Sequence, residues 1–202
     1  TEGSSGRRVL VTESSSQCLT HCSRIIEGMS ILNVARMGNP VLREKARSIE
    51  RSELLTPVMQ KLIDDMIQTM VEYEGIGLAG PQVHEQRQIF VAGVENGEDP
   101  MPLIVVVNPV LTLLGSPTVE DWEGCLSIPD LRGRVPRAPE VELRALDRYG
   151  EPMQLAAHGL AARVIQHETD HLNGVLFVDR MQSFDSLTHL NEFSRFWNTE
   201  RD

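Results

Sequence analysis

The chain has 202 residues, of which 41% are hydrophobic and 24% charged, and its formal net charge at pH 7 is −10. This length is sufficient for one domain with a sizeable core, and the composition is that of a globular protein rather than a disordered one. So acidic a chain does not favour a nucleic acid-binding surface, because such surfaces rely on Lys and Arg. We find no run of about 18 apolar residues and therefore expect no membrane-spanning segment.

Three cysteines are too few for a disulfide framework in a chain of this size, which favours a reducing compartment. Cys18 and Cys22 lie in a serine-rich segment with no second pair of ligands, so we interpret them as incidental thiols rather than a metal clip. Residues 1–28 are expected to form an extension outside the fold, either a tag remnant or a targeting segment. Met29 is a plausible natural start.

Residues 31–35, the first well-patterned stretch, are expected to form a short strand or an extended lead-in. A helix is predicted further on, because Thr56 suits the N-cap and Pro57 the first helical position. Gly75 is expected to end this helix. Its apolar residues recur with helical spacing and should face the core: Val58, Leu62, Ile63, Met66, Ile67 and Met70.

The stretch 88–144 has the pattern of β-structure. Pro and Gly punctuate its apolar runs, which suggests antiparallel connections between the strands. The predicted strands are 88–92, 103–107, 110–114 and 141–146, with a further one at 153–156. Asn108 and Pro109 are expected to end the second of them.

A second helix is predicted over residues 159–173, with Gly174 placed to end it, and a third over about 186–197. Because helices and strands do not alternate along the chain, their order favours an α+β fold. We expect antiparallel or mixed β-sheets packed around the second helix, with an N-terminal helix and a C-terminal helix.

The second helix contains the pattern H-E-x-x-H, which is typical of metal-dependent hydrolases. Residues four apart share one helix face, so His167 and His171 direct their imidazoles to one point, with Glu168 close enough to reach a water there. Leu160 and Val164 continue the stripe of His167 toward the start of the helix, so the histidine pair is expected to face the interior. These features make it the central metal-binding helix of the predicted fold.

A catalytic metal usually takes three protein ligands, and the helix supplies two. One family of zinc peptidases places a third histidine where this chain has Phe177, which cannot ligate. The acids downstream that remain available, Asp179, Asp185 and Glu192, have no supporting motif. Cys125 in the segment EGCLS is the strongest candidate, and a thiolate ligand widens the choice of metal from zinc to Fe(II), Ni or Co.

Three segments, GIGLAGPQ (75–82), EGCLS (123–127) and QHETDH (166–171), together resemble the three signature motifs of the peptide deformylase family. The similarity runs from about residue 31 to residue 181. We therefore expect a catalytic domain over residues 29–181, followed by a C-terminal tail, 182–202, that is predicted to be helical. One departure is Gly80, which stands where many members have alanine and which removes no functional group.

The resemblance implies a hydrolase that removes the N-formyl group from the N-terminal formyl-methionine of newly synthesised polypeptides. Cys125, His167 and His171 would bind one divalent metal ion per chain, natively Fe(II), with Zn, Ni or Co possible in the purified protein. Glu168 would be the general base and acid, and the side-chain amide of Gln82 and the backbone N–H of Leu126 would hold the formyl oxygen. The implied substrate-binding residues, with Arg163 at the pocket mouth facing solvent, are Ile76, Gly77, Glu123, Gly124, Leu160, Arg163 and Val164.

The expected partners are formyl-methionyl nascent peptides and, transiently, the ribosome, with neither nucleic-acid reading nor membrane binding. The expected location is the bacterial cytoplasm, or an organelle if residues 1–28 are a native targeting segment. Two other functions are weighed against this one. A zinc endopeptidase lacks its third-ligand motif here, and an inactive metal-binding, ribosome-associated module would be expected to have lost Glu168, Gln82 or a ligand, all of which are present.

Overall fold

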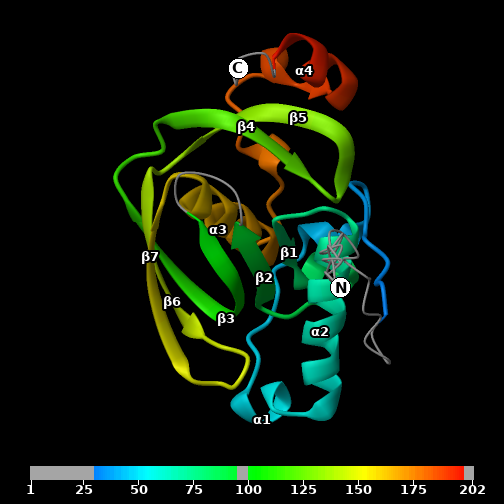
Figure 1. Cartoon of the computed structure of the whole chain (residues 1–202), viewed down its shortest axis with the longest axis vertical. Helices are drawn as coiled ribbons and strands as arrows, with labels where there is room; N and C mark the ends of the chain where they lie inside the picture. The colour runs from blue at the N-terminus through cyan, green and yellow to red at the C-terminus, as the bar shows by residue number, and fades with distance from the viewer. Residues whose placement is uncertain (1–29, 95–99, 198–202) are drawn as a thin grey trace, which may run out of the picture.

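A computed structural model of the chain describes residues 30–94 and 100–197; residues 1–28, with Cys18 and Cys22, lie outside the described residues. Within these ranges four α-helices and eight β-strands are connected by loops and short 3-10 turns (Figure 1). The helices are α1 (Arg51–Leu54), α2 (Pro57–Glu72), α3 (Gly159–Leu172) and α4 (Leu190–Phe196). The strands are β1 (Gly77–Ala79), β2 (Ile89–Val94), β3 (Met101–Leu114), β4 (Val119–Cys125), β5 (Ile128–Arg137), β6 (Glu140–Leu146), β7 (Pro152–His158) and β8 (Thr188–His189).

Helix α2 begins where its capping residues predict. The Thr56 hydroxyl accepts a hydrogen bond from the Met59 N–H at 3.3 Å, and Pro57 is the first helical residue. The predicted apolar stripe is confirmed for Ile63, Met66 and Met70, which are buried. It is wrong at its start, because Val58 is 81% exposed and Met59 is buried in its place. At the first turn the face toward the core therefore lies one residue further along the chain.

The larger sheet has five strands in the order β1-β2-β3-β6-β7, and all neighbours pair antiparallel. The predicted break at Asn108 and Pro109 is wrong, since β3 continues through both residues. The register shifts between Val107 and Val110, and Asn108 adopts a φ of 52°. Its side chain exchanges two hydrogen bonds of 2.8 Å with the backbone of Ile49, which accounts for the irregularity as a stabilised bulge.

The smaller sheet has the order β4-β5-β8 and lies apart from the larger one, at the top of Figure 1. Strands β4 and β5 form a hairpin whose turn is residues 126–127, closed by the pairing of Cys125 with Ile128. Both fall within the stretch predicted as β, but their bounds could not be assigned from the sequence. Residues 31–35 belong to no helix or strand.

Helix α3 is the centre of the fold, as predicted. Eleven of its fourteen residues are buried, so it is enclosed on nearly all sides. One face of the larger sheet packs against α3 through a core that contains Phe90, Val106 and Leu143, and the other face packs against α2. The α+β class is therefore confirmed.

The end of α3 depends on Gly174, as the sequence predicts. Gly174 has a φ of +73°, and a Cβ at this position would lie 2.5 Å from the carbonyl oxygen of Arg43. Any side chain would therefore be strained by its backbone and would collide with a neighbouring loop.

The C-terminal segment is only partly helical. Strand β8 pairs with β5 through Leu131 and Arg132, and the seven-residue helix α4 follows it. The Trp122 ring of β4 contacts Phe193 at a centroid distance of 4.9 Å and Trp197 at 5.5 Å. The tail is therefore fastened to the smaller sheet by strand pairing and aromatic contacts.

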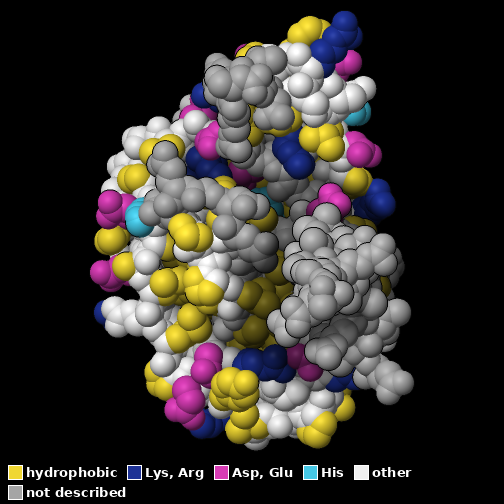
Figure 2. Space-filling model, viewed as in Figure 1, with side chains coloured by type: hydrophobic (Ala, Val, Ile, Leu, Met, Phe, Trp, Pro, Cys, Tyr) yellow, Lys and Arg dark blue, Asp and Glu magenta, His cyan; other side chains and the backbone are white. Residues whose placement is uncertain are grey.

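The surface combines charge of both signs with apolar groups. On the face drawn in Figure 2, Lys and Arg side chains are scattered among Asp and Glu, and hydrophobic side chains gather over the sheet. Strand β3 contributes exposed apolar residues, among them Leu103 and Val110. No helix of the described residues is long and apolar enough to cross a membrane.

Gly174→Ala is expected to lower the free energy of unfolding by about 2–4 kcal/mol, because it adds a backbone collision to left-handed strain. Gly150→Ala is the matched control, since Gly150 has a φ of +75° but faces only the side chain of Arg51. It should cost about 1 kcal/mol. Urea unfolding of both variants measures the difference, and equal losses would contradict the assigned role of the collision.

Candidate metal centre

Helix α3 and the end of β4 bring a thiol and two imidazoles to one point. His171 Nε2 lies 3.2 Å from Cys125 Sγ and 3.2 Å from His167 Nε2. All three potential ligand atoms lie within 4.8 Å of one another, and all three residues are buried. The alternative ligand Asp179 is engaged elsewhere, in an ion pair with Arg43 and a hydrogen bond from the Leu176 N–H.

This trio fits a divalent metal ion. Two imidazole nitrogens that each bind a tetrahedral ion at about 2.0 Å are separated by about 3.3 Å, close to the spacing found here. Burial opposes ionisation of the Cys125 thiol, but His171 and His167 hold its pKa well below the ordinary value. The thiolate, which is the form that binds metal, is therefore favoured, and three protein ligands leave room for one further ligand.

The carboxylate of Glu123 orients His167. Its Oε2 accepts a hydrogen bond from His167 Nδ1 at 2.9 Å, which leaves Nε2 directed at Cys125 and His171. Burial disfavours the Glu123 carboxylate, but His167 and Arg137 outweigh it and hold the pKa below the usual range. Glu123 was predicted to bind substrate, whereas here its oxygens are occupied by buried partners.

Arg163 was expected at the pocket mouth facing solvent, and this is wrong. Its side chain is 7% exposed and its guanidinium donates to Glu123 Oε1 at 2.8 Å, to the Val135 carbonyl at 2.8 Å and to the Val119 carbonyl at 2.7 Å. The physical reason is that backbone carbonyls of β4 and β5 face α3 and require donors. Arg163 therefore joins the helix to the smaller sheet.

Two further buried charges were missed in the sequence. Arg137 donates through Nε and Nη2 to Glu123 at 2.8 and 3.0 Å and through Nη1 to Asp170 at 2.6 Å. Asp170 in turn accepts from Arg180 Nη2 at 2.6 Å. The position of Asp170 on the helix between the two histidines could have indicated that it is buried. The sequence does not show which arginines approach it.

Glu168 lies beside the trio and is 3% exposed. Burial raises its pKa to about 7, so the side chain can exchange a proton near neutral pH. Its Oε2 has no hydrogen-bond partner among the described residues. The backbone of Gly77 passes so close that a Cβ there would lie 2.2 Å from Glu168 Oε1, so only glycine leaves the carboxylate its place.

Gln82 presents its amide nitrogen to the same point. Its Oε1 accepts from the Ala79 N–H at 2.8 Å, and its Nε2 donates to Cys125 Sγ at 3.4 Å. Leu126 directly follows Cys125 in the turn between β4 and β5. The predicted role of both residues as oxyanion donors stays a prediction.

The remaining predicted substrate residues combine exposed and buried positions. Ile76 and Leu160 are 45% and 41% exposed, whereas Val164 is buried. The guanidinium of Arg132 lies over Gly124, where it would meet any added Cβ. Direct contact between these residues and a substrate stays a prediction.

A buried Cys/His/His group that could hold a metal ion, beside a carboxyl whose pKa is raised to about 7 and an amide donor, is the arrangement of a metal-dependent hydrolase. A family model described as polypeptide deformylase matches residues 31–186. The chain therefore belongs to the polypeptide deformylase family.

Individual relatives agree with this assignment. The chain is 41% identical to "Peptide deformylase 2" of Nostoc sp. over 76% of its own length and 87% of the relative's, and 41% identical to "Peptide deformylase" of Carboxydothermus hydrogenoformans over 75% and 94%. It also resembles the Met-Ala-Ser-bound crystal structure of a class I type b peptide deformylase from Acinetobacter baumannii. That structure has a TM-score of 0.72 and 36% identity, with 75% of this chain and 99% of that chain covered.

Glu123→Gln is expected to weaken metal binding by about 10- to 100-fold, because the neutral amide no longer fixes the orientation and basicity of His167. Glu120→Gln is the control, since Glu120 is exposed and its carboxylate is paired with the exposed Arg134 at 3.6 Å. Competition with a chelator followed by metal analysis gives the affinity. Wild-type affinity in Glu123→Gln would contradict the orienting role.

Proposed function

We propose that this protein hydrolyses the N-formyl amide of formyl-methionyl peptides through the site around Cys125, His167 and His171. Membership of the polypeptide deformylase family supports the reaction, which fits better than a zinc endopeptidase. The observation that carries the proposal is the convergence of three metal-binding atoms, Glu168 and the Gln82 amide at one buried point. The A. baumannii relative bound to Met-Ala-Ser supports a substrate that begins with methionine.

A divalent metal ion held by Cys125, His167 and His171 supplies a Lewis acid and lowers the pKa of a bound water toward neutrality. Glu168 is the general base in this proposal. Its carboxylate removes a proton from the attacking water, whose oxygen forms a bond to the formyl carbon. The same carboxyl then gives that proton to the amine nitrogen as the C–N bond breaks, which releases formate and a free N-terminus. The pKa of about 7 suits both roles, since neither form is strongly disfavoured.

Gln82 and Leu126 stabilise the charge that develops on the formyl oxygen. The Gln82 amide is held with its nitrogen toward Cys125. In this proposal an N–H therefore already points to the position of the formyl oxygen before the substrate binds. The Leu126 backbone N–H, next in sequence to Cys125, provides a second donor. Donors fixed in advance are worth about 3–4 kcal/mol each in sites of this kind.

Leu160, Val164 and Ile76 provide apolar surface for the methionine side chain, and the backbones of Gly77 and Gly124 adjoin the peptide. The buried contacts of Glu123 and Arg163 hold β4 and β5 against α3, the helix that carries Leu160 and Val164. Residues 29–181 form the catalytic domain in this proposal.

The native metal proposed here is Fe(II). A thiolate with two imidazoles suits Fe(II) as well as zinc, nickel or cobalt, and metal analysis of anaerobically purified protein distinguishes them. The substrates are nascent chains, which supports a transient contact with the ribosome, and the bacterial relatives support action in the bacterial cytoplasm.

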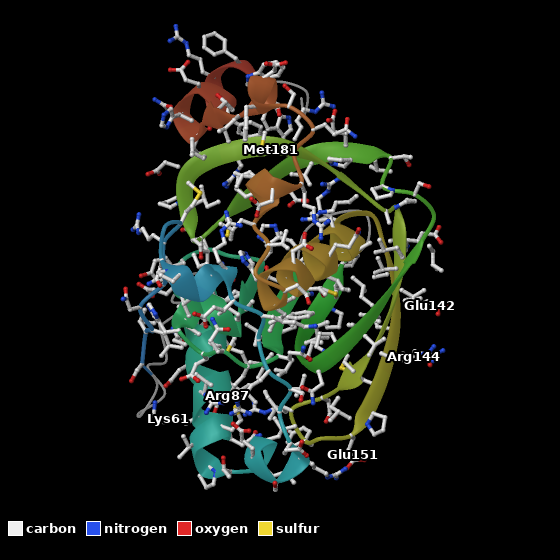
Figure 3. All side chains as sticks on the ribbon, turned by 180° about the vertical axis from the view of Figure 1, so that it is seen from behind. Lys61, Arg87, Glu142, Arg144, Glu151 and Met181 are labelled. Carbon is white, nitrogen blue, oxygen red and sulfur yellow. The ribbon has the colours of Figure 1, made fainter. Side chains whose placement is uncertain are left out.

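Glu168→Gln is expected to retain the metal and to lower kcat for a formyl-Met peptide by at least about a thousandfold, since no other group takes the proton. Glu142→Gln is the control, because Glu142 points outward from β6 at the edge of the molecule in Figure 3. Formate release and bound metal are measured together. A kcat within about tenfold of wild type would contradict the role of Glu168, because a general base contributes about 10²-fold or more.

Gly77→Ala is expected to displace the Glu168 carboxylate and to lower kcat by about 100-fold while the metal is retained, since small displacements of a reacting group are costly. Glu168 and the new methyl group cannot occupy the positions that the structure gives them. Kinetics and metal content decide the point. Unchanged kcat in a metal-loaded variant would show that Gly77 does not set the position of Glu168.

A further inference from the structure

The Gln82 amide is held by more contacts than an oxyanion donor alone requires. A primary amide offers one carbonyl oxygen and two N–H groups. The oxygen accepts from the Ala79 N–H, which fixes which end of the amide is nitrogen. The nitrogen lies 3.4 Å from Cys125 Sγ and 3.2 Å from the hydroxyl oxygen of Ser127. One N–H is therefore taken by Ser127 and the other is left directed toward the metal-binding residues.

Ser127 is fully buried, and its backbone is fixed independently of its hydroxyl. Its N–H donates to Cys125 Sγ at 3.4 Å, and its carbonyl accepts from the Met37 N–H at 2.8 Å. The Gln82 carbonyl accepts from the Ala35 N–H at 2.7 Å, so one short segment, 35–37, connects the backbones of both residues. The spacing between Ser127 and Gln82 thus does not depend on the hydroxyl, whose contact can be removed without loss of the fold.

We propose that Ser127 is a positioning residue for the reaction, whose hydroxyl accepts one amide N–H of Gln82 and thereby aims the other at the formyl oxygen. This inference rests on the proposed function, in which Gln82 is an oxyanion donor. Without the hydroxyl, the Ala79 contact still holds the amide oxygen, but the amide plane can turn about that anchor. The donor is then present but poorly aimed, and the loss falls on the transition state rather than on substrate binding.

A double-mutant cycle with Ser127→Ala, Gln82→Ala and the double variant tests this proposal on metal-loaded protein. Ser127→Ala should lower kcat for a formyl-Met peptide by about tenfold and leave KM within about twofold of wild type. The expected loss in kcat is smaller than the roughly 10²- to 10³-fold loss for complete removal of an oxyanion donor. In the Gln82→Ala background the same change should alter kcat by less than about twofold, because its target is gone. An equal loss in both backgrounds would overturn the proposal.

A second measurement does not depend on activity. The side-chain amide protons of Gln82, followed by NMR, should shift and exchange faster with solvent in Ser127→Ala, and unchanged resonances would also overturn the proposal. Thr69→Val is the control, because Thr69 is equally buried but bonds to Leu32 and Asp65 away from the site. It should lower stability and leave kcat unchanged. Absence of deformylation in the wild type would instead reject the proposed function, and the amide signals would still report whether Ser127 orients Gln82.

Discussion

Burying α3 removes most of its polar side chains from water, and the surrounding structure supplies partners for several of them. An unpartnered amide or charge in an interior costs several kcal/mol, roughly the size of a domain's whole stability. Gln166 exchanges two 3.0 Å hydrogen bonds with the backbone of Ala138, Asp170 meets Arg137, and Arg163 meets the carbonyls of β4 and β5. These bonds fix the smaller sheet to one side of the helix.

The same contacts place the metal ligands. Because Arg137 and Arg163 hold the Glu123 carboxylate, Glu123 can hold His167, and strand β4, which contains Glu123, ends at Cys125. A shift of the hairpin would therefore move the thiol and turn the imidazole together. The buried polar atoms left without a partner among the described residues are Glu168 Oε2, Thr169 Oγ1, His171 Nδ1 and Gln86 Oε1.

The elements that the sequence predicted best are those whose signals are local. Helix α2 carries its own cap in Thr56, and α3 carries the ligand pair and Gly174 within one stretch of chain. Cys125 was identifiable because the histidine pair lacked a third donor. Family resemblance then supplied Gln82 and Leu126, which spacing alone would not have assigned.

The errors concern interactions between distant segments. Asn108 and Pro109 have the composition of a break, but a bulge anchored on Ile49, 59 positions away, keeps β3 continuous. Arg163 has the composition of a surface residue, and only the carbonyls of β4 and β5 make burial favourable for it. The role proposed for Ser127 could not be inferred from the sequence, because it depends on a contact with Gln82, 45 positions earlier.

The central claim is that a metal held by Cys125, His167 and His171 is required for deformylation. Its most direct test is to titrate anaerobically purified protein with a chelator and to measure bound metal and formate release from a formyl-Met peptide at each step. We predict that activity falls in proportion to bound metal and returns when Fe(II) is added back. Formate release that persists at its full rate after the metal has been removed would contradict the account.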